Sequence, residues 1–496
     1  MKICIAFLLA LFFLAACGGG DADAPAANGT ADSGPLLGVA DAPPTGAGNA
    51  DGEGIPGVFE YQREAVPIVT PAPPHPFFDH RSVNAVVITP PIYYAVQSFF
   101  NGMAAIMTEV GIGFVDSTGA VVVPVDYIGA GAFIGDVSYV MRADYTIVFI
   151  DRTGRELFSL PDGVYPVTLT HLDPCEEGFF IVAEWVEADT GAGQWLWGMV
   201  DDTGFEVIPR RFNNIFPFRD GRARVQYGVR WGFIDVYGEM AVEPRFHWAF
   251  DFVDGAAVVE EGALAATRRA SIIDIYGREL GVLAYPLMSS FSGGLGRFHQ
   301  RFPAGQGFVN TLGQVVIPPI FFDARDFSEG LAAAQLTYDG YWGFIDGTGH
   351  WVVQPQFLQV RDFSDGMAAV AVHDANEQTR WGFINTAGET TIIPVFAWVD
   401  DFHEGFAVVN LEAEIYYPRW DSELWQGVVG VPWVVGGIYT LIDHWGREVL
   451  DLSQFDMLGQ VSEGVLVINE GWQLGGTPTG RYIAEQGLWG FLRVAN

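Results

Sequence analysis

Apolar residues occur along most of the chain in short runs bounded by Gly, Pro and Asp, a pattern typical of β-strands rather than long helices. One clear run, Trp342–Ile345, leads into Asp346-x-x-Gly349. This is a tight turn, in which Asp caps backbone N–H groups ahead of it and Gly accepts a positive φ. Val352 and Val353 predict the next strand, and Pro355 is expected to end its pairing because it lacks an N–H. With Leu331–Ala334, a strand of small side chains, these runs predict an antiparallel β-meander.

The same unit recurs through the chain. Close copies begin at Trp197, Trp231 and Trp381, while Gly113–Asp116 and Gly307–Asn310 keep the pattern without the Trp. The turn glycines are Gly119, Gly154, Gly204, Gly238, Gly277, Gly313, Gly349, Gly388 and Gly446. Six of the eight intervals between them are 34–39 residues long, which chance would not produce. The fold class predicted is all-β, a tandem array of about ten such repeats over residues 86–496.

A second signature, Phe-x-acid-Gly, lies between these units. Copies begin at Phe252, Phe327, Phe363 and Phe402, with an early variant at Phe99. The Phe side chains, together with Phe357, are expected to bury between neighbouring units. The acids recur with the architecture, which makes them weak catalytic candidates.

The full string, Trp-Gly-Phe-Ile-Asp-x-x-Gly, then Pro, then Phe-x-acid-Gly, resembles the WG-repeat family of bacterial proteins over roughly residues 82–496. This resemblance implies an all-β repeat array without known catalytic residues, in a family of poorly defined function. The chain departs from the family in lacking the basic residue that often precedes Trp-Gly, except at Arg230 and Arg380.

The array begins and ends in the middle of a unit. Val86–Pro90 matches the end of a repeat, and Leu488–Leu492 matches its middle. In a propeller-like ring these two halves would complete one blade, whereas in an open superhelical solenoid they would be caps. The sequence leaves both architectures open.

The charge of the chain excludes some classes of binding partner. The formal charge is −35, with 60 acids against 25 bases, and the only lysine is Lys2. Such a surface repels phosphate backbones and anionic lipid headgroups, which argues against nucleic acid and against membrane docking by the folded domain. It favours solubility, cationic partners or loose binding of cations.

The N-terminus has the features of an exported protein. Residues 1–17 join a positive start to an apolar run that ends in Leu14-Ala15-Ala16-Cys17. This ending resembles the lipobox of bacterial lipoproteins. The resemblance implies acylation of Cys17 and a cell-membrane location on the extracytoplasmic side. The alternative is an ordinary signal peptide with an accidental cysteine. Residues 18–55, rich in Gly, Ala, Asp and Pro, predict a disordered tether, and residues 56–85 a lead-in or cap.

Other chemistry was weighed against plainer interpretations. The turn aspartates could be calcium ligands, but they recur one per unit without the neighbouring oxygens of a calcium loop, so turn capping is the better account. The histidines form no HExxH pair, and Cys175 lies among acids with only His171 nearby. No nucleophile turn, phosphate loop or dinucleotide fingerprint occurs. The sequence predicts no metal, no cofactor and no catalytic residue.

Three insertions interrupt the repeat, at residues 171–195, 411–437 and 470–486. Departures from a repeat map to loops on one face, and aromatic side chains on loops suit stacking on sugars or anchoring a protein. The alternative is that these side chains fill local core. The candidate ligand-binding residues are Tyr416, Tyr417, Trp420, Trp425 and Trp433.

These features favour a surface-anchored, non-enzymatic binding scaffold with an unknown protein or glycan ligand. Two alternatives stay open. An envelope glycan-active enzyme would use paired carboxylates on a propeller-like fold, and a structural envelope protein would pack its repeats against neighbours.

Overall fold

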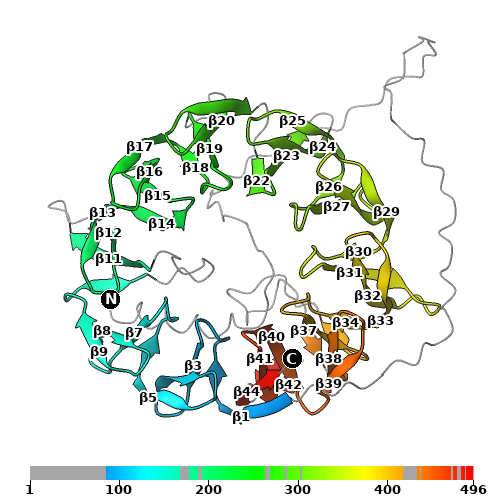
Figure 1. Ribbon diagram of the computed structural model, residues 1–496, viewed down its shortest axis with the longest axis horizontal. Coiled ribbons are helices and arrows are strands. Elements are labelled where there is room, and N and C mark those ends of the chain that lie inside the picture. The colour runs from blue at the N-terminus through cyan, green and yellow to red at the C-terminus, as the bar shows by residue number, and fades with distance from the viewer. Residues whose placement is uncertain are drawn as a thin grey trace, which may run out of the picture. The chain divides into compact units, whose positions relative to one another are not determined.

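The computed structural model describes residues 85–167, 178–187, 193–262, 269–283, 287–301, 304–416, 433–435, 437–470, 473–476, 482–485 and 488–494. These residues form strands, turns and bends, with no helix among them. The strands build ten four-stranded antiparallel sheets that follow one another around a ring, so the fold is a ten-bladed β-propeller (Figure 1). The predicted all-β array of about ten units is confirmed, and the choice between ring and solenoid is decided for the ring.

The blades are numbered here from the first complete sheet, with strands given from the inside of the ring outward. Blade 1 contains β2 (Ala95–Val96), β3 (Met103–Met107), β4 (Ile112–Asp116) and β5 (Val121–Tyr127). Blade 2 contains β6 (Gly129–Ala130), β7 (Val137–Met141), β8 (Ile147–Asp151) and β9 (Glu156–Ser159). Blade 3 contains β10 (Val164–Pro166), β11 (Phe180–Glu187), β12 (Gly193–Val200) and β13 (Glu206–Phe212). Blade 4 contains β14 (Asn214–Arg219), β15 (Arg222–Tyr227), β16 (Arg230–Ile234) and β17 (Met240–Phe246). Blade 5 contains β18 (Trp248–Ala249), β19 (Ala256–Glu261), β20 (Arg269–Asp274) and β21 (Glu279–Leu283).

The second half of the ring repeats this order. Blade 6 contains β22 (Leu287–Ser292), β23 (Leu295–Arg301), β24 (Ala304–Asn310) and β25 (Val315–Phe321). Blade 7 contains β26 (Asp323–Ala324), β27 (Leu331–Gln335), β28 (Trp342–Asp346) and β29 (Trp351–Phe357). Blade 8 contains β30 (Gln359–Val360), β31 (Met367–His373), β32 (Thr379–Asn385) and β33 (Thr390–Phe396). Blade 9 contains β34 (Trp398–Val399), β35 (Phe406–Asn410), β38 (Tyr439–Asp443) and β39 (Glu448–Asp451). Blade 10 contains β40 (Met457–Ser462), β41 (Val465–Glu470), β44 (Leu488–Val494) and β1 (Ala85–Tyr93), and two extra hairpins, β36 (Glu414–Tyr416) with β37 (Trp433–Val435) and β42 (Gln473–Gly476) with β43 (Tyr482–Glu485), extend blades 9 and 10.

Both ends of the described chain meet in blade 10. The first strand, β1, is the outermost strand of this blade and pairs antiparallel with the last strand, β44. Val86 lies opposite Arg493, and Val87 lies opposite Leu492. The two half-units seen in the sequence therefore complete one blade, and this pairing closes the ring.

The antiparallel order gives each blade two different ends. The turn from the first to the second strand and the turn from the third to the fourth lie on one face of the ring, which we call the turn face. The hairpin between the second and third strands and the connection to the next blade lie on the opposite face, the hairpin face. On the turn face Arg152, in a third-to-fourth turn, accordingly reaches Asp136, in a first-to-second turn, with 2.6 Å between Nε and Oδ1.

The hydrophobic core lies mainly between blades. Phe344 of blade 7 and Phe363 of blade 8 are both buried, with ring centroids 4.9 Å apart and an interplanar angle of 64°. Phe99 of blade 1 and Phe491 of blade 10 make the same contact at 5.0 Å, so this packing continues across the closure. The expected burial of the Phe-x-acid-Gly phenylalanines is confirmed, and Phe357 is buried in the same cluster.

The Trp-Gly glycine and the later proline form one structural feature. The prediction that Pro355 ends its strand was wrong, because β29 continues through it to Phe357 with a register shift. An outermost strand tolerates Pro because no further strand needs its N–H. A Cβ built on Gly343 would lie 2.4 Å from the oxygen of Val353 and 2.7 Å from the nitrogen of Pro355. The Gly is thus required by the close approach of the outer strand.

Candidate binding face

On the turn face, the Phe-x-acid-Gly acids link one blade to the next. Glu329 and Gly330 both have positive φ and form the tight turn between β26 and β27. The Glu329 carboxylate accepts a hydrogen bond from the backbone N–H of Gly366, the turn glycine of the next blade, at 2.9 Å. Glu463 accepts the same bond from Gly102 at 2.7 Å and so joins blade 10 to blade 1. Equivalent acids are Asp220, Asp254, Asp365 and Glu404.

The serine of the same motif makes a parallel link. Ser328 Oγ donates to the carbonyl oxygen of Phe363 at 2.6 Å, and Ser462 Oγ donates to that of Phe99 at 2.8 Å. Both bonds cross from one blade to the next. These acids and serines therefore have a structural role, since they hydrogen-bond neighbouring blades. The sequence predicted such a role for the acids but not their bonding partners.

The turn aspartates cap their own turns, as predicted. Asp346 Oδ1 accepts the N–H groups of Thr348 and His350 and the Thr348 hydroxyl, at 2.6–3.1 Å. In Asp151, a hydrogen bond from the Thr153 hydroxyl contributes most to lowering the pKa of the carboxyl, to about 2. Asn310 and Asn385 make the same backbone bonds without a charge. In the part of the chain that the structure describes, no three His, Cys, Asp or Glu side chains are grouped to hold a metal ion.

A guanidinium group bridges the inner part of several blade interfaces. Arg224 of blade 4 is buried, and its guanidinium carbon lies 3.9 Å from the Phe216 ring centroid and 5.1 Å from that of Trp231. Its Nε lies 2.9 Å from Asp251 Oδ1 in blade 5. Burial raises the pKa of Asp251, while the charge of Arg224 opposes that rise. Arg361 repeats the arrangement near Trp381 and Asp400.

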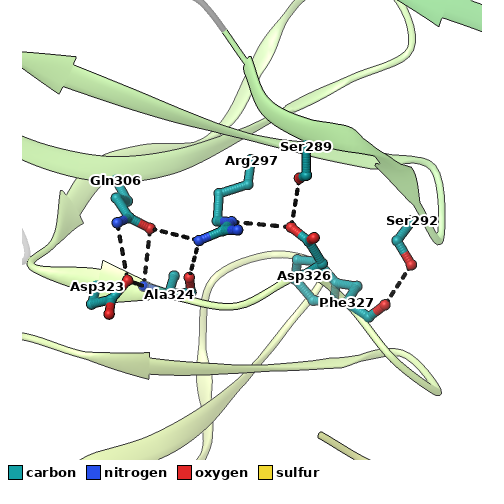
Figure 2. Close-up of polar contacts among 8 residues, drawn as sticks. All are labelled: Ser289, Ser292, Arg297, Gln306, Asp323, Ala324, Asp326 and Phe327. Atoms are coloured by element: carbon teal, nitrogen blue, oxygen red, sulfur yellow. Dashed lines mark hydrogen bonds and ion pairs between the residues drawn. The ribbon is translucent and has the colours of Figure 1, made fainter. Parts of the chain in front are cut away.

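The interface between blades 6 and 7 uses polar groups where other interfaces use the Trp of Trp-Gly (Figure 2). Gln306 stands where other repeats have the Trp of Trp-Gly. Its Nε2 donates a hydrogen bond to Asp323 Oδ1, and its Oε1 accepts one from the backbone N–H of Ala324, both at 3.0 Å. Arg297 lies beside it and reaches Asp326 at 3.0 Å. The loss of Trp in this repeat is therefore compensated by hydrogen bonds rather than by apolar packing.

The departures from the repeat lie on the hairpin face. The extra hairpins β36–β37 and β42–β43 lie in second-to-third-strand connections, and β11 and β12 lengthen the same connection in blade 3. Near the tip of the blade 3 hairpin, Trp185 pairs across the strands with Trp195, at 5.4 Å between ring centroids. These side chains are 39% and 40% exposed, so they do not fill the core.

Sequence reasoning placed the candidate site in residues 411–437. Tyr416 and Trp433 are brought together, because they are paired in register across β36 and β37. Tyr417, Trp420 and Trp425 lie outside the described residues, as do Cys17, His171 and Cys175. The Trp185–Trp195 pair lies in the insertion at residues 171–195 and was not among the candidate residues; its signal in the sequence is a Trp on each strand of the lengthened hairpin.

Further exposed aromatic side chains lie on the same face. Phe322 and Tyr338 pack edge to face at 5.6 Å, at the connection into blade 7 and its hairpin. Tyr94 donates a hydrogen bond to Glu109 at 2.6 Å. The other exposed rings on this face are Tyr145, Tyr227, Trp248 and Tyr341.

Comparison with known proteins supports the repeat assignment. The family model described as WG containing repeat matches residues 197–228, 231–264, 307–338, 342–374 and 381–413. Five segments of the chain thus match the model of this repeat. No curated protein matches the chain in sequence. Within the described residues, no helix is long and apolar enough to cross a membrane.

Solved structures resemble the ten-bladed ring only distantly. A eukaryotic initiation factor is 12% identical, with 70% of this chain and 94% of that one covered and a TM-score of 0.41. The tricorn protease is 13% identical, with coverage of 79% and 47% and a TM-score of 0.27. BamB from Moraxella catarrhalis is 13% identical, with coverage of 57% and 82% and a TM-score of 0.23. These likenesses carry no argument about function.

Proposed function

We propose that this protein is a non-enzymatic binding scaffold, anchored at the cell surface, whose WG-repeat ring presents its hairpin face to a ligand. The observation that carries the proposal is the concentration of non-repeating structure on that face. The long blade 3 hairpin and the two extra hairpins are not needed to build a blade, since blades without them have the same four strands. Loops that vary on a rigid scaffold are where binding residues concentrate.

The recurring acids favour binding over catalysis. A glycan-active enzyme needs two carboxylates facing one substrate, one of them with a raised pKa. The acids of the turn face instead accept hydrogen bonds from turn N–H groups, and Asp251 and Asp401, whose pKa burial raises, each lie beside an Arg of the preceding blade. These roles are architectural.

A binding screen on the purified chain, with glycan and protein arrays, tests the proposal. A first variant shortens the blade 3 hairpin: Asn-Gly replaces residues 185–195, so that Glu184 and Leu196 become the last strand pair. A second variant replaces residues 411–437 by a Gly-Asn turn and retains the Asn410–Tyr439 pair. We expect both variants to melt within a few degrees of the parent and at least one to lose ligand. Ligand binding that both variants retain in full would contradict a site on these hairpins.

The anchor is tested separately. Cys17→Ala should release the protein from the membrane fraction, because stable attachment of a protein by lipid requires acyl chains. A variant that still fractionates with membranes after a high-salt wash would contradict lipid anchoring. The same fractionation of Cys4→Ala is the control, since Cys4 lies inside the predicted leader.

A further inference from the structure

We propose that the hairpin face binds a basic protein segment, with its aromatic rings and carboxylates receiving Arg or Lys side chains. This inference rests on the proposed function and names the chemistry of its partner. The first observation concerns the surroundings of two arginines at blade interfaces. Arg224 and Arg361 each lie near a Trp ring and a carboxylate of the next blade. The fold thus repeatedly holds a guanidinium between aromatic rings and carboxylates.

On the turn face, two exposed rings also have an arginine of the chain beside them. The guanidinium of Arg447 lies 4.5 Å from the centroid of the exposed Trp445 ring and is paired with Asp443. Arg278 lies 5.3 Å from the Tyr276 ring centroid and is paired with Asp274. In each of these two turns the protein itself supplies the cation that lies beside the ring and the carboxylate.

On the hairpin face, exposed rings stand beside carboxylates. Tyr94 is hydrogen-bonded to Glu109. Trp185 and Glu187 are two residues apart on β11 and therefore point to the same side of the strand, and Tyr338 precedes Asp339 in the blade 7 hairpin. Each pair offers a ring and an acid toward solvent, the two kinds of group that lie beside a guanidinium elsewhere in this fold.

The charge of the chain favours a cation as occupant. The net charge is −35, and three arginines on the hairpin face are paired with acids of the chain, Arg142 with Glu156, Arg269 with Glu279 and Arg380 with Asp374. A second copy of this chain or an acidic polymer would be repelled. A basic segment would gain electrostatic attraction and ring contacts at several blades, so its binding should depend on the rings as well as on the charge.

The test uses the purified chain and a fluorescent peptide of alternating Arg and Gly, with fluorescence anisotropy at physiological salt. An alternating Glu-Gly peptide and a neutral chitin oligosaccharide are the comparison probes. The double variant Trp185→Ala/Tyr338→Ala should weaken binding of the basic peptide by about 10-fold or more. The matched turn-face variant Phe205→Ala/Tyr237→Ala, which also removes two exposed rings, should remain within about twofold of the parent.

The acids are tested in the same way. Asp339→Asn should weaken the basic peptide more than Asp202→Asn, an equal change of charge at an exposed turn-face acid. The chain also allows a direct map, because its only lysine is Lys2. With a Lys-Gly peptide, carbodiimide cross-links between carboxylates and amines should concentrate at Glu109, Glu187 and Asp339.

The outcomes separate this inference from the proposed function. Equal losses from both double variants would show unspecific attraction to an acidic protein and overturn the basic-segment proposal. Binding of the chitin oligosaccharide that is lost only in the hairpin-face variant would preserve the binding function but overturn its basic partner. If none of the three probes, nor any ligand from the arrays, depends on the hairpin face, both proposals fail.

Discussion

The two faces of the ring are built from the same strands but differ in regularity. On the turn face, Glu329 reaches Gly366 of the next blade and Glu463 reaches Gly102 across the closure, so one bond recurs around the ring. On the hairpin face, the connections between second and third strands range from two residues between β15 and β16 to an added hairpin in blades 9 and 10. One face is constrained by contacts between blades, whereas the other is free to vary. Recurrence in this chain therefore accompanies contacts between blades, whereas the departures lie on the face where we propose that the ligand binds.

The largest expected effect concerns the packing beneath the turn face. Phe344→Ala should lower the free energy of unfolding by about 3–5 kcal/mol, because it removes a fully buried ring from the interface between blades 7 and 8. Chemical denaturation followed by tryptophan fluorescence measures it. Phe205→Ala, at an exposed ring on the same face, is the control and should change stability by no more than about 0.5 kcal/mol.

The next effect concerns turn geometry. Gly388 has φ +80°, and an added Cβ would lie 2.5 Å from Val353 Cγ2 of the preceding blade. Gly388→Ala should therefore cost about 1–3 kcal/mol through backbone strain and the clash together. Gly366, at φ +77°, has nothing within 4 Å of an added Cβ, so Gly366→Ala incurs the strain alone. Equal losses of stability in the two variants would show that contact between blades does not matter at this turn.

Much of this regular face could be predicted from the sequence, because each of its parts recurs. The Asp-x-x-Gly turns, the Phe-x-acid-Gly segments and the two half-units of blade 10 were all visible as repeated or interrupted patterns. The innermost strands were missed, since β26 and β30 have only two residues each, too few to show a period. The role of Glu329 was also missed, because its partner lies 37 residues further along the chain.

The candidate site was harder to predict for the same physical reason. An insertion has no second copy, so nothing in the sequence shows which of its side chains face solvent. Residues 411–437 attracted attention by their aromatic content, while the described part of the hairpin face owes its exposed rings to single residues such as Tyr338 and Phe322. Their contact, between a hairpin and the connection into the same blade, depends on the fold.

A smaller effect depends on pH and separates charge from shape in the turns. Hydrogen bonding, led by the Thr153 hydroxyl, lowers the pKa of Asp151 to about 2 in the folded chain, below the value of about 3.9 for an unfolded Asp. Its charge therefore stabilises the fold above pH 4, and this contribution is lost as the pH falls through 2. Asp151→Asn retains the acceptor, as Asn385 does naturally, so it should cost at most about 1 kcal/mol at neutral pH.

Urea unfolding at several pH values measures this difference. The parent and Asp151→Asn should converge between pH 4 and pH 2. Asp202→Asn, which removes the same charge at an exposed position, is the control at neutral pH and should there stay close to the parent in stability. A gap between the parent and Asp151→Asn that stays constant down to pH 2 would mean that the carboxylate charge does not contribute to the turn.

The smallest expected effect on stability is on the hairpin face and completes the comparison. Trp195 packs against Trp185 at 5.4 Å and against Tyr165 at 6.1 Å, but its side chain is 40% exposed and lies near the tip of a hairpin. A cross-strand pair of this kind contributes about 0.2–1 kcal/mol. Trp195→Ala should thus change the urea midpoint far less than Phe344→Ala, although it removes a larger side chain. A loss as large as that from Phe344→Ala would show that the blade 3 hairpin is part of the folding core, and the distinction between a constrained and a variable face would no longer hold.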